Sequence, residues 1–285
     1  MNIFTIKSRM SFKYCFKKGY IRIPVEKHIL LVHVLGVPNS MSEIEEICKD
    51  YEVILLEDSC ESVGSTYKGK TTGTFGTMST FSTYFGHHFS TIEGGLVSTD
   101  DFELYEILKS IRSHGWSRDL SEETRAKLRE EHNIDTFRDL YSFYYPGFNL
   151  RATEVQAFLG LGQIEGLRSK NHVRKFNFSR YQDNIVNDYW KVRVSSGDYI
   201  SNFAYPIIHP KKDDIVRGLQ DNNIECRPLV CGNIARQPYF TKLYGHRDFE
   251  FADIVHDYGL YVPNHPDMST SDVDKVCEVV NEVTR

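Results

Sequence analysis

Two adjacent histidines, His87 and His88, lie between a β-rich run and a Glu-Gly-Gly turn in residues 77–101, which read TMSTFSTYFGHHFSTIEGGLVSTDD. An imidazole titrates near neutral pH and can remove or return a proton during a reaction. Two carboxylates, Glu57 and Asp58, end an earlier apolar run, and Asp58 precedes His87 by 29 residues. A carboxylate at a strand end and an imidazole on a tight loop indicate a site for acid–base chemistry.

The segments that would position these residues alternate between strand and helix. Residues 28–36, HILLVHVLG, are typical of a strand buried on both faces. A helical pattern follows with Ser40 as its predicted N-cap, and residues 52–58, EVILLED, form the next buried strand. Strand, helix and strand in this order predict a parallel sheet with a right-handed crossover. Chemistry in such sheets gathers at the carboxyl ends of the strands, where Glu57 and Asp58 lie.

The rest of the chain predicts further helices and a second α+β region. Residues 101–115 form a clear helix stopped by Gly115, and residues 121–132 are a polar helical patch. A run that starts just after Asn149 has helical periodicity over more than twenty residues, long enough to link two domains. From about residue 190 strands and helices alternate again, which predicts a smaller α+β domain.

The bulk composition argues against several classes of protein. The chain has 285 residues, of which 40% are hydrophobic and 26% charged, with a net charge of −5. That balance gives no reason to expect nucleic acid or an anionic membrane as a partner. The six cysteines form no C-x-x-C pair, which is typical of reduced cytoplasmic thiols and disfavours a zinc or iron–sulfur site. No apolar run reaches membrane-spanning length. A cytoplasmic protein is the expectation.

Several motifs, taken in order, resemble the DegT/DnrJ/EryC1/StrS family of sugar aminotransferases, which use pyridoxal phosphate (PLP). The motifs are VHVLGVPNSMSEI, LLEDSCESVGSTYKGKTTGTFGTMSTFS, EGGLVSTDD, IRSHGW and PGFNLRATEVQAFLGLGQIE. The resemblance implies an α/β fold of the PLP-dependent transferase (aspartate aminotransferase-like) type, with an incomplete large parallel-sheet domain and a smaller C-terminal α+β domain. The expected parts are a basic segment (1–23), a partial cofactor-binding large domain (24–165), and a linking helix with a small domain (166–285).

The resemblance explains the histidine pair. Most of the family has, at the position of His87, the lysine that binds PLP covalently, and this chain has no lysine there. A branch with histidine at this position, the GDP-4-keto-6-deoxymannose 3-dehydratases, resembles the chain in its HH pair. The CDP-sugar 3-dehydratases also have histidine but add a cysteine cluster for an iron–sulfur centre after a W-x-R-D segment. Here GWSRDLSEETRAKLREEH contains no cysteine, which disfavours that branch.

The histidine implies a particular reaction. The cofactor would stay non-covalent and rest as pyridoxamine phosphate (PMP), with glutamate as the amino donor. Its amine would condense with the 4-keto group of a nucleotide-diphosphate sugar, and His87 would remove the C4′ proton as general base. Loss of the 3-hydroxyl and hydrolysis would release a 3-deoxy 4-keto sugar and ammonia. The alternatives are a nucleotide-sugar aminotransferase, which the missing lysine argues against, and a non-catalytic nucleotide-sugar-binding or dimerisation module.

Resemblance also assigns cofactor contacts. Asp58 would pair with the pyridine nitrogen, Glu61 would lie near the ring and Ser82 would contact the phosphate. The structural alternatives are a strand-end helix cap, an exposed turn carboxylate and a sheet-buried hydroxyl, respectively. His88 is expected to be a loop residue and not a second base. A metal site that joins both loop histidines to His114 is disfavoured, because neighbouring side chains on an extended segment diverge.

The resemblance also implies substrate contacts and a homodimer. His114 and Arg118 resemble residues of the active-site rim, although a helix C-terminal pair is the structural alternative. Asn149 and Arg151 resemble residues that reach into the neighbouring subunit's site, where Asn149 would contact the phosphate. Arg227 would bind the nucleotide diphosphate through its guanidinium fork, with a surface salt bridge as the alternative. The nucleotide remains open between GDP, dTDP, CDP and UDP.

The first 23 residues carry six Lys or Arg and no acidic residue. A transit peptide, a short basic strand and an imperfect gene start are all compatible with this pattern. In the family, a strand and a helix whose N-terminus grips the PLP phosphate precede the region that matches residue 25. The chain is therefore expected to be N-terminally truncated and to bind PLP weakly when alone. Three explanations stay open: a separate polypeptide supplies the missing part, the start of the sequence is wrong, or the chain is a decayed or truncated copy.

Overall fold

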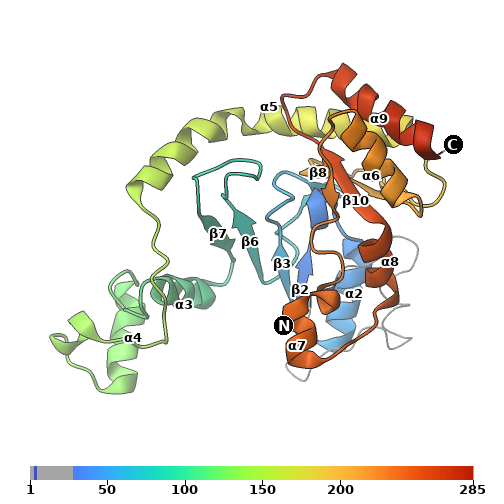
Figure 1. The fold of residues 1–285 in the computed structure, drawn as a ribbon. Coiled ribbons are helices and arrows are strands. Elements are labelled where there is room, and N and C mark those ends of the chain that lie inside the picture. The colour runs from blue at the N-terminus through green and yellow to red at the C-terminus, as the bar shows by residue number, and fades with distance from the viewer. Residues whose placement is uncertain (1–2, 5–27, 285) are drawn as a thin grey trace.

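The structure, a computed structural model, describes residues 3–4 and 28–284 (Figure 1). The basic segment predicted at 1–23 therefore lies outside the described residues, apart from Ile3 and Phe4. The main sheet has the strand order β1-β2-β3-β6-β7. Its strands are β1 (Ile3–Phe4), β2 (His28–Val32), β3 (Ile54–Asp58), β6 (Met78–Ser82) and β7 (Gly95–Ser98).

Three of the neighbouring strand pairs in this sheet are parallel, as the sequence predicts. The parallel pairs are β1 with β2, β2 with β3, and β3 with β6. The last strand, β7, pairs antiparallel with β6, so the sheet is mixed. The connection between β6 and β7 is the loop of residues 83–94 at the carboxyl end of β6, and this loop carries the histidine pair.

The crossover between β2 and β3 is made by helix α2 (Met41–Tyr51). Its buried face packs on the strands because Ile44 and Ile47 belong to one cluster with Ile29 and Leu31. Ser40 is the N-cap residue, as predicted, and its side chain makes no capping hydrogen bond.

The strand predicted at 28–36 ends early, at Val32. A 3-10 turn follows at η1 (Val34–Gly36). The backbone of Leu35 and Gly36 takes positive φ values of 54° and 84°, which no strand can accommodate. This turn brings the chain across the end of β3, where the candidate residues lie.

The remaining elements complete the two regions that Figure 1 shows on either side of the sheet. Around the sheet are β4 (Thr66–Tyr67), β5 (Lys70–Thr71), α3 (Phe102–Arg112), α4 (Glu122–His132) and η2 (Arg138–Tyr141). The C-terminal part contains β8 (Ala204–Ile208), α6 (Lys212–Asp221), β9 (Arg227–Pro228), η3 (Ile234–Arg236), α7 (Pro238–Tyr244), α8 (Glu250–Tyr258), β10 (Gly259–Pro263) and α9 (Thr270–Thr284).

A single long helix, α5 (Glu154–Asn184), arches from the α3 side of the sheet to the C-terminal elements (Figure 1). It starts in a capping box, in which Thr153 and Gln156 satisfy each other's backbone N–H groups. The predicted long helix is thus confirmed. The domain boundary predicted between residues 165 and 166 falls inside this continuous helix, and the division of the chain there stays a prediction.

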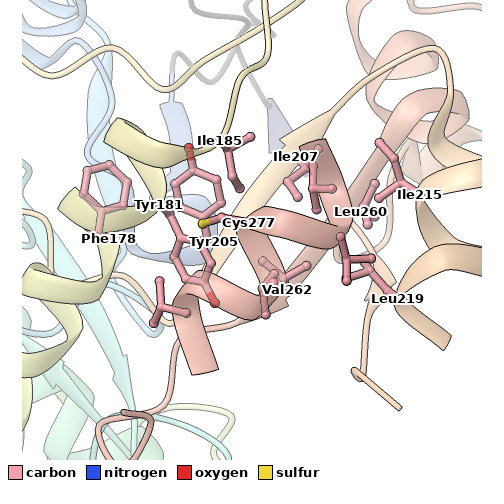
Figure 2. Packing of buried hydrophobic residues seen from close by; sticks show 14 of the residues in the cluster. Phe178, Tyr181, Ile185, Tyr205, Ile207, Ile215, Leu219, Leu260, Val262 and Cys277 are labelled. Carbon is pink, nitrogen blue, oxygen red and sulfur yellow. The ribbon is translucent and has the colours of Figure 1, made fainter. Parts of the chain in front are cut away.

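The C-terminal part has its own hydrophobic core, built on the antiparallel sheet β8-β10-β9. Helix α5 contributes Tyr181, whose ring stacks on Tyr205 of β8 with centroids 4.8 Å apart (Figure 2). Residues from α6 and α9, such as Leu219 and Val280, are fully buried in the same cluster. This packing fixes the end of α5 to the C-terminal sheet. Within residues 28–284, no helix is both long and apolar enough to cross a membrane.

A buried carboxylate, Glu57, holds the end of the main sheet together. Its side chain is 0% exposed. It accepts hydrogen bonds from the backbone N–H groups of Gly73, Phe75 and Gly76 at 2.7–2.8 Å and from His33 Nε2 at 3.0 Å. Burial alone would raise the pKa of Glu57, but the hydrogen bonds from His33, Gly76 and Gly73 lower it below its ordinary value. The side chain is therefore an anion inside the protein.

The hydrogen bonds of His33 identify its tautomer. Its Nδ1 atom faces two donors of Asn39, the backbone N at 3.3 Å and Nδ2 at 3.2 Å. Because both partners donate, Nδ1 must accept, and the proton lies on Nε2, which donates to Glu57. The backbone N–H of His33 also donates to the carbonyl oxygen of Asp58 at 3.0 Å. One histidine thus braces two consecutive residues at the end of β3.

We expect Glu57→Gln to lower the free energy of unfolding by roughly 3 kcal/mol, because the amide would turn N–H donors toward backbone donors and remove charge-assisted bonds. Stability from Glu57 is present above the ordinary carboxyl pKa and is lost as the pH falls through its lowered pKa. The variant should lack this part of the acid dependence. Urea unfolding at several pH values measures both effects.

The matched control is Glu45→Gln. Glu45 forms an exposed ion pair with Lys70 at 3.2 Å, and its loss should cost less than about 1 kcal/mol. Equal unfolding midpoints for the two variants would contradict a structural role of Glu57.

Candidate active site

Asp58, Glu61 and His87 come together at the carboxyl ends of β3 and β6. Asp58 is the last residue of β3 and lies beside Thr80 of β6 in the sheet register. Its Oδ1 atom accepts a hydrogen bond from the backbone N–H of Cys60 at 3.1 Å, in a tight turn. The charge of Asp58 acts on both partners: it opposes the lowering of the pKa of His87 by burial, and it adds to the raising of the pKa of Glu61 by burial. The sequence-predicted pair of strand-end carboxylate and loop imidazole is thus brought together.

The structural alternative to a role of Glu61 near the cofactor ring was an exposed carboxylate in a turn, and Glu61 is not exposed. It is partly buried, and its Oε2 atom accepts a hydrogen bond from the backbone N–H of Leu35 at 2.6 Å. Burial raises the pKa of Glu61, the bond from Leu35 lowers it, and the charge of Asp58 raises it, with a raised pKa as the result. Glu61 therefore takes up a proton more readily than an ordinary glutamate.

His87 lies in the loop between β6 and β7, where its backbone N–H donates to the carbonyl oxygen of Tyr84 at 3.0 Å. Its ring makes edge contacts with Tyr84 and with Phe203, at centroid distances of 5.9 Å and 5.5 Å. Burial lowers the pKa of His87, although the charge of Asp58 opposes this. The imidazole is therefore neutral at neutral pH, which is the form that can accept a proton.

Ser82 is placed at the end of β6, close in sequence to the His87 loop. Its register partner is Gly95 of β7. Its Oγ atom accepts a hydrogen bond from the backbone N–H of Tyr84 at 3.1 Å. The predicted contact of Ser82 with a cofactor phosphate stays a prediction.

The predicted rim residues form a second group, centred on Trp116. The Trp116 ring lies 4.9 Å from the ring of His114, 4.1 Å from the guanidinium of Arg118 and 6.0 Å from that of Arg151. Arg151 also donates through Nε to Asn149 Oδ1 at 3.4 Å. Both arginines thus lie within cation–π distance of one indole. Sequence reasoning named four members of this group and missed the tryptophan at its centre.

A buried aspartate, Asp139, holds the segment that carries this second group. It accepts hydrogen bonds from Ser117 and Tyr144 and forms ion pairs with Arg125 and Arg129 of α4. Burial would raise the pKa of Asp139, but these partners lower it to about 2. The ion pairs of Asp139 therefore attach the segment around Trp116 to α4.

The two groups are separate within this chain. Figure 1 shows α3 and α4 beyond one end of β7, whereas the loop between β6 and β7 lies at the other end, beneath α5. In the part of the chain that the structure describes, no hydrogen bond, ion pair or ring contact joins His114, Arg118, Asn149 or Arg151 to His87. The same part holds no group of three or more His, Cys, Asp or Glu arranged to bind a metal ion.

Arg227 lies apart from both groups, on β9 of the C-terminal sheet. It is exposed, and its Nε and Nη2 atoms donate to Glu225 at 2.8 Å and 2.5 Å. Arg227 thus forms the surface salt bridge that was the structural alternative to binding a nucleotide diphosphate. Its role in binding a nucleotide diphosphate stays a prediction.

Comparison with known proteins gives one consistent result. Residues 22–281 match the sequence profile of the DegT/DnrJ/EryC1/StrS aminotransferase family. GDP-4-keto-6-deoxy-D-mannose 3-dehydratase of Escherichia coli O55:H7 is 36% identical over 263 residues, which cover 89% of this chain and 67% of that protein. The chain thus spans about two thirds of the length of this relative.

Solved structures agree with the sequence match. The E. coli GDP-4-keto-6-deoxy-D-mannose-3-dehydratase with bound hydrated PLP superposes with a TM-score of 0.77 at 33% identity. The match covers 89% of this chain and 67% of that one. A structure of GDP-4-keto-6-deoxymannose-3-dehydratase with a trapped PLP-glutamate geminal diamine gives the same TM-score, 0.77, identity, 33%, and coverage of the two chains, 89% and 67%.

The electrostatics of the site can be tested directly. We expect Asp58→Asn to lower the pKa of His87 further, because the charge of Asp58 is what raises it against burial. Histidine titration followed by NMR measures this pKa, with the His87 signals identified by their loss in His87→Gln. The control is Asp50→Asn, an exposed residue of α2. A His87 pKa that rises or stays unchanged in Asp58→Asn would rule out the coupling.

Proposed function

Because the chain belongs to the DegT/DnrJ/EryC1/StrS aminotransferase family, we propose that it takes part in the PLP/PMP-dependent 3-dehydration of a nucleotide-linked 4-keto-6-deoxy sugar. The family and the PLP-dependent transferase fold that the motifs imply are both confirmed. One observation carries the proposed reaction. The loop position that resembles the family's lysine holds His87, a neutral imidazole beside the strand-end carboxylate Asp58. A neutral imidazole can accept a proton but cannot hold the cofactor covalently.

The charge of the site supports a cationic aromatic ring as its ligand. Asp58 and Glu61 lie close together, and within residues 28–284 no lysine or arginine forms an ion pair with either. A protonated pyridine nitrogen would supply the missing positive charge. Asp58 would hold that nitrogen, Glu61 would lie near the ring, and Ser82 would bind the phosphate. Asn149 would reach the phosphate from a second subunit.

The chain's own residues would move one proton. When bound, the cofactor supplies the amine that condenses with the 4-keto group and the ring that takes up electrons. His87 would accept the proton that leaves C4′ and return it to the departing 3-hydroxyl, which leaves as water. We assign this to Nε2, because Nδ1 of His87 is buried. Glutamate would restore the amine, in line with the PLP-glutamate adduct of the related dehydratase.

The related dehydratases also suggest the substrate class. The enzymes of Escherichia coli O55:H7 and Yersinia pseudotuberculosis are GDP-4-keto-6-deoxy-D-mannose 3-dehydratases, so we propose GDP-4-keto-6-deoxymannose as the first substrate to test. His114, Arg118 and Arg151 would contact the sugar or its phosphates at the rim of the site. Arg227 would bind the diphosphate after exchanging its ion pair with Glu225. These assignments rest on the family resemblance and on the cation-rich surroundings of Trp116.

We propose that a second copy of the chain completes the site. The first half of α5 leaves four apolar side chains more than half exposed: Val155, Phe158, Leu161 and Ile164. Because an α-helix turns by about 100° per residue, Phe158 and Leu161 share one face, and Val155 and Ile164 lie at its two edges. Apolar side chains gathered in this way on a surface are typical of a helix that lies against another protein surface. A homodimer would also explain why, within residues 28–284, Asn149 and Arg151 contact each other, His114 and Trp116 but not Asp58, Glu61 or His87.

The missing lysine gives a sharp test of the chemistry. We expect His87→Lys to form a covalent bond with added PLP that borohydride makes permanent, because the lysine would lie where Asp58 can hold the cofactor ring. Mass spectrometry after reduction should find the adduct at residue 87. The wild-type chain should bind PLP without an adduct there, and ammonia release from the sugar should be lost in the variant.

The control for that experiment is His172→Lys, which places a lysine on the exposed surface of α5. It should give no residue-specific adduct. A borohydride-stable PLP adduct at a single lysine of the wild-type chain would favour an aminotransferase instead. Failure of both the wild type and His87→Lys to bind PLP would favour the non-catalytic module.

The dimer has its own test. We expect the chain to sediment as a dimer at micromolar concentration, and Phe158→Glu to shift it toward monomer by at least tenfold in dissociation constant, because a charge would be buried in the interface. Phe176→Glu, on the other half of α5, is the matched control and should leave the dimer intact. A wild-type chain that sediments only as a monomer would refute the proposal.

A further inference from the structure

His88, the second histidine of the pair, is buried, with 4% of its surface exposed. Its Nε2 atom lies 2.6 Å from the carbonyl oxygen of Ser201, which is 113 residues away in sequence. A carbonyl oxygen only accepts hydrogen bonds, so the proton must lie on Nε2, which donates. Burial and the positive charge of Arg174 lower the pKa of His88 to about 4. His88 therefore remains neutral at physiological pH and keeps this donor.

The acceptor of this bond belongs to a rigid part of the molecule. The backbone N–H of Ser201 donates to Ser65 Oγ at 3.0 Å, and that hydroxyl donates to the carbonyl oxygen of Gly36 at 2.9 Å. A Cβ atom on Gly36 would lie 2.4 Å from the carbonyl oxygen of Glu61 and 2.8 Å from the Cα atom of Asn202. Three backbone segments therefore touch where no side chain fits.

The joint formed by Gly36, Glu61 and Asn202 is also held by Asn264, the residue after β10, and by helix α5. Asn264 Nδ2 donates to Asn202 Oδ1 at 2.6 Å. Arg174, a buried residue of α5, donates through Nη1 to the carbonyl oxygens of Phe203 and Asn264. Since the Phe203 ring also contacts His87, the segment that holds His88 provides one wall around its neighbour as well.

We propose that His88 is a positioning residue for His87, which it keeps at a fixed place by donating Nε2–H to the carbonyl oxygen of Ser201. The bond fastens the loop between β6 and β7 to the joint formed by Gly36, Glu61 and Asn202. The loop imidazole and the second carboxylate of the site thus share one anchor. The inference rests on the proposed role of His87 as the base, although its test does not require turnover.

Three variants separate the hydrogen bond from the bulk of the side chain. The amide nitrogen of glutamine lies near the place of the Nε2 atom, so His88→Gln can keep the bond to Ser201. The amide nitrogen of asparagine lies near Nδ1 and is too short to reach the same oxygen. His88→Leu has similar bulk and no donor at all. The contrast between glutamine on one side and asparagine and leucine on the other is therefore diagnostic.

The readout is the NMR titration of His87 in the full chain without cofactor. In the wild type its pKa should lie below the ordinary value, because the ring is partly buried. His88→Gln should leave that pKa unchanged. His88→Asn and His88→Leu should shift it up toward the ordinary value, because the loop opens and water reaches the ring. Circular dichroism identifies the temperature range in which all variants are folded, and the titrations are made there.

Two results would overturn the inference. A wild-type titration curve in both His88→Asn and His88→Leu would show that the loop needs no anchor, and a shifted curve in His88→Gln would show that the bond is not what holds it. Where ammonia release is measurable, His88→Asn should lower kcat roughly a hundredfold with little change in KM. If the wild type releases no ammonia, the proposed function fails while the titrations still decide the role of His88.

Discussion

The candidate site depends on the buried negative charge of Glu57, with which no lysine or arginine of residues 28–284 forms an ion pair. Burying a carboxylate is costly unless hydrogen bonds replace its water, and Glu57 receives four, three from the backbone of residues 73–76 and one from His33. Those bonds fasten the loop that enters β6 to the end of β3. Because Asp58 is the next residue of β3 and His87 lies in the loop after β6, the bonds of Glu57 hold together the two strands that carry the carboxylate and the imidazole.

Burial acts in opposite directions on the acidic and basic members of the site. It raises the pKa of Glu61 and lowers the pKa of His87, so each tends toward its neutral form. Asp58 pulls both values upward through its charge. The site therefore has a net negative charge and an unprotonated imidazole, a combination suited to a ligand that brings a positive charge and gives up a proton.

Local sequence patterns predicted much of the fold and the main pair of site residues. Periodicity and β-rich runs located β2, α2, β3 and α5, since those signals come from neighbouring residues. The contacts of His87 with Phe203 and of His88 with Ser201 join positions more than a hundred residues apart, and no local pattern reports them. Trp116 was missed for the same reason, because its partners gather only in the folded chain. The early end of β2 depends on positive φ at Leu35, a residue type that gives no warning of it.

His87, whose ring is partly exposed, and His88, which is buried and hydrogen-bonded, are consecutive residues. This arrangement has a consequence for how such sites can evolve. Residue 87 has a ring with no hydrogen bond to the rest of the described chain, whereas residue 88 is bonded into the interior. The side chain proposed to react and the side chain that attaches the loop therefore belong to two consecutive residues, each of which can be substituted separately. A change at the first could alter the chemistry while the loop keeps its place, so one scaffold can pass from one reaction to another through single substitutions without first losing its architecture.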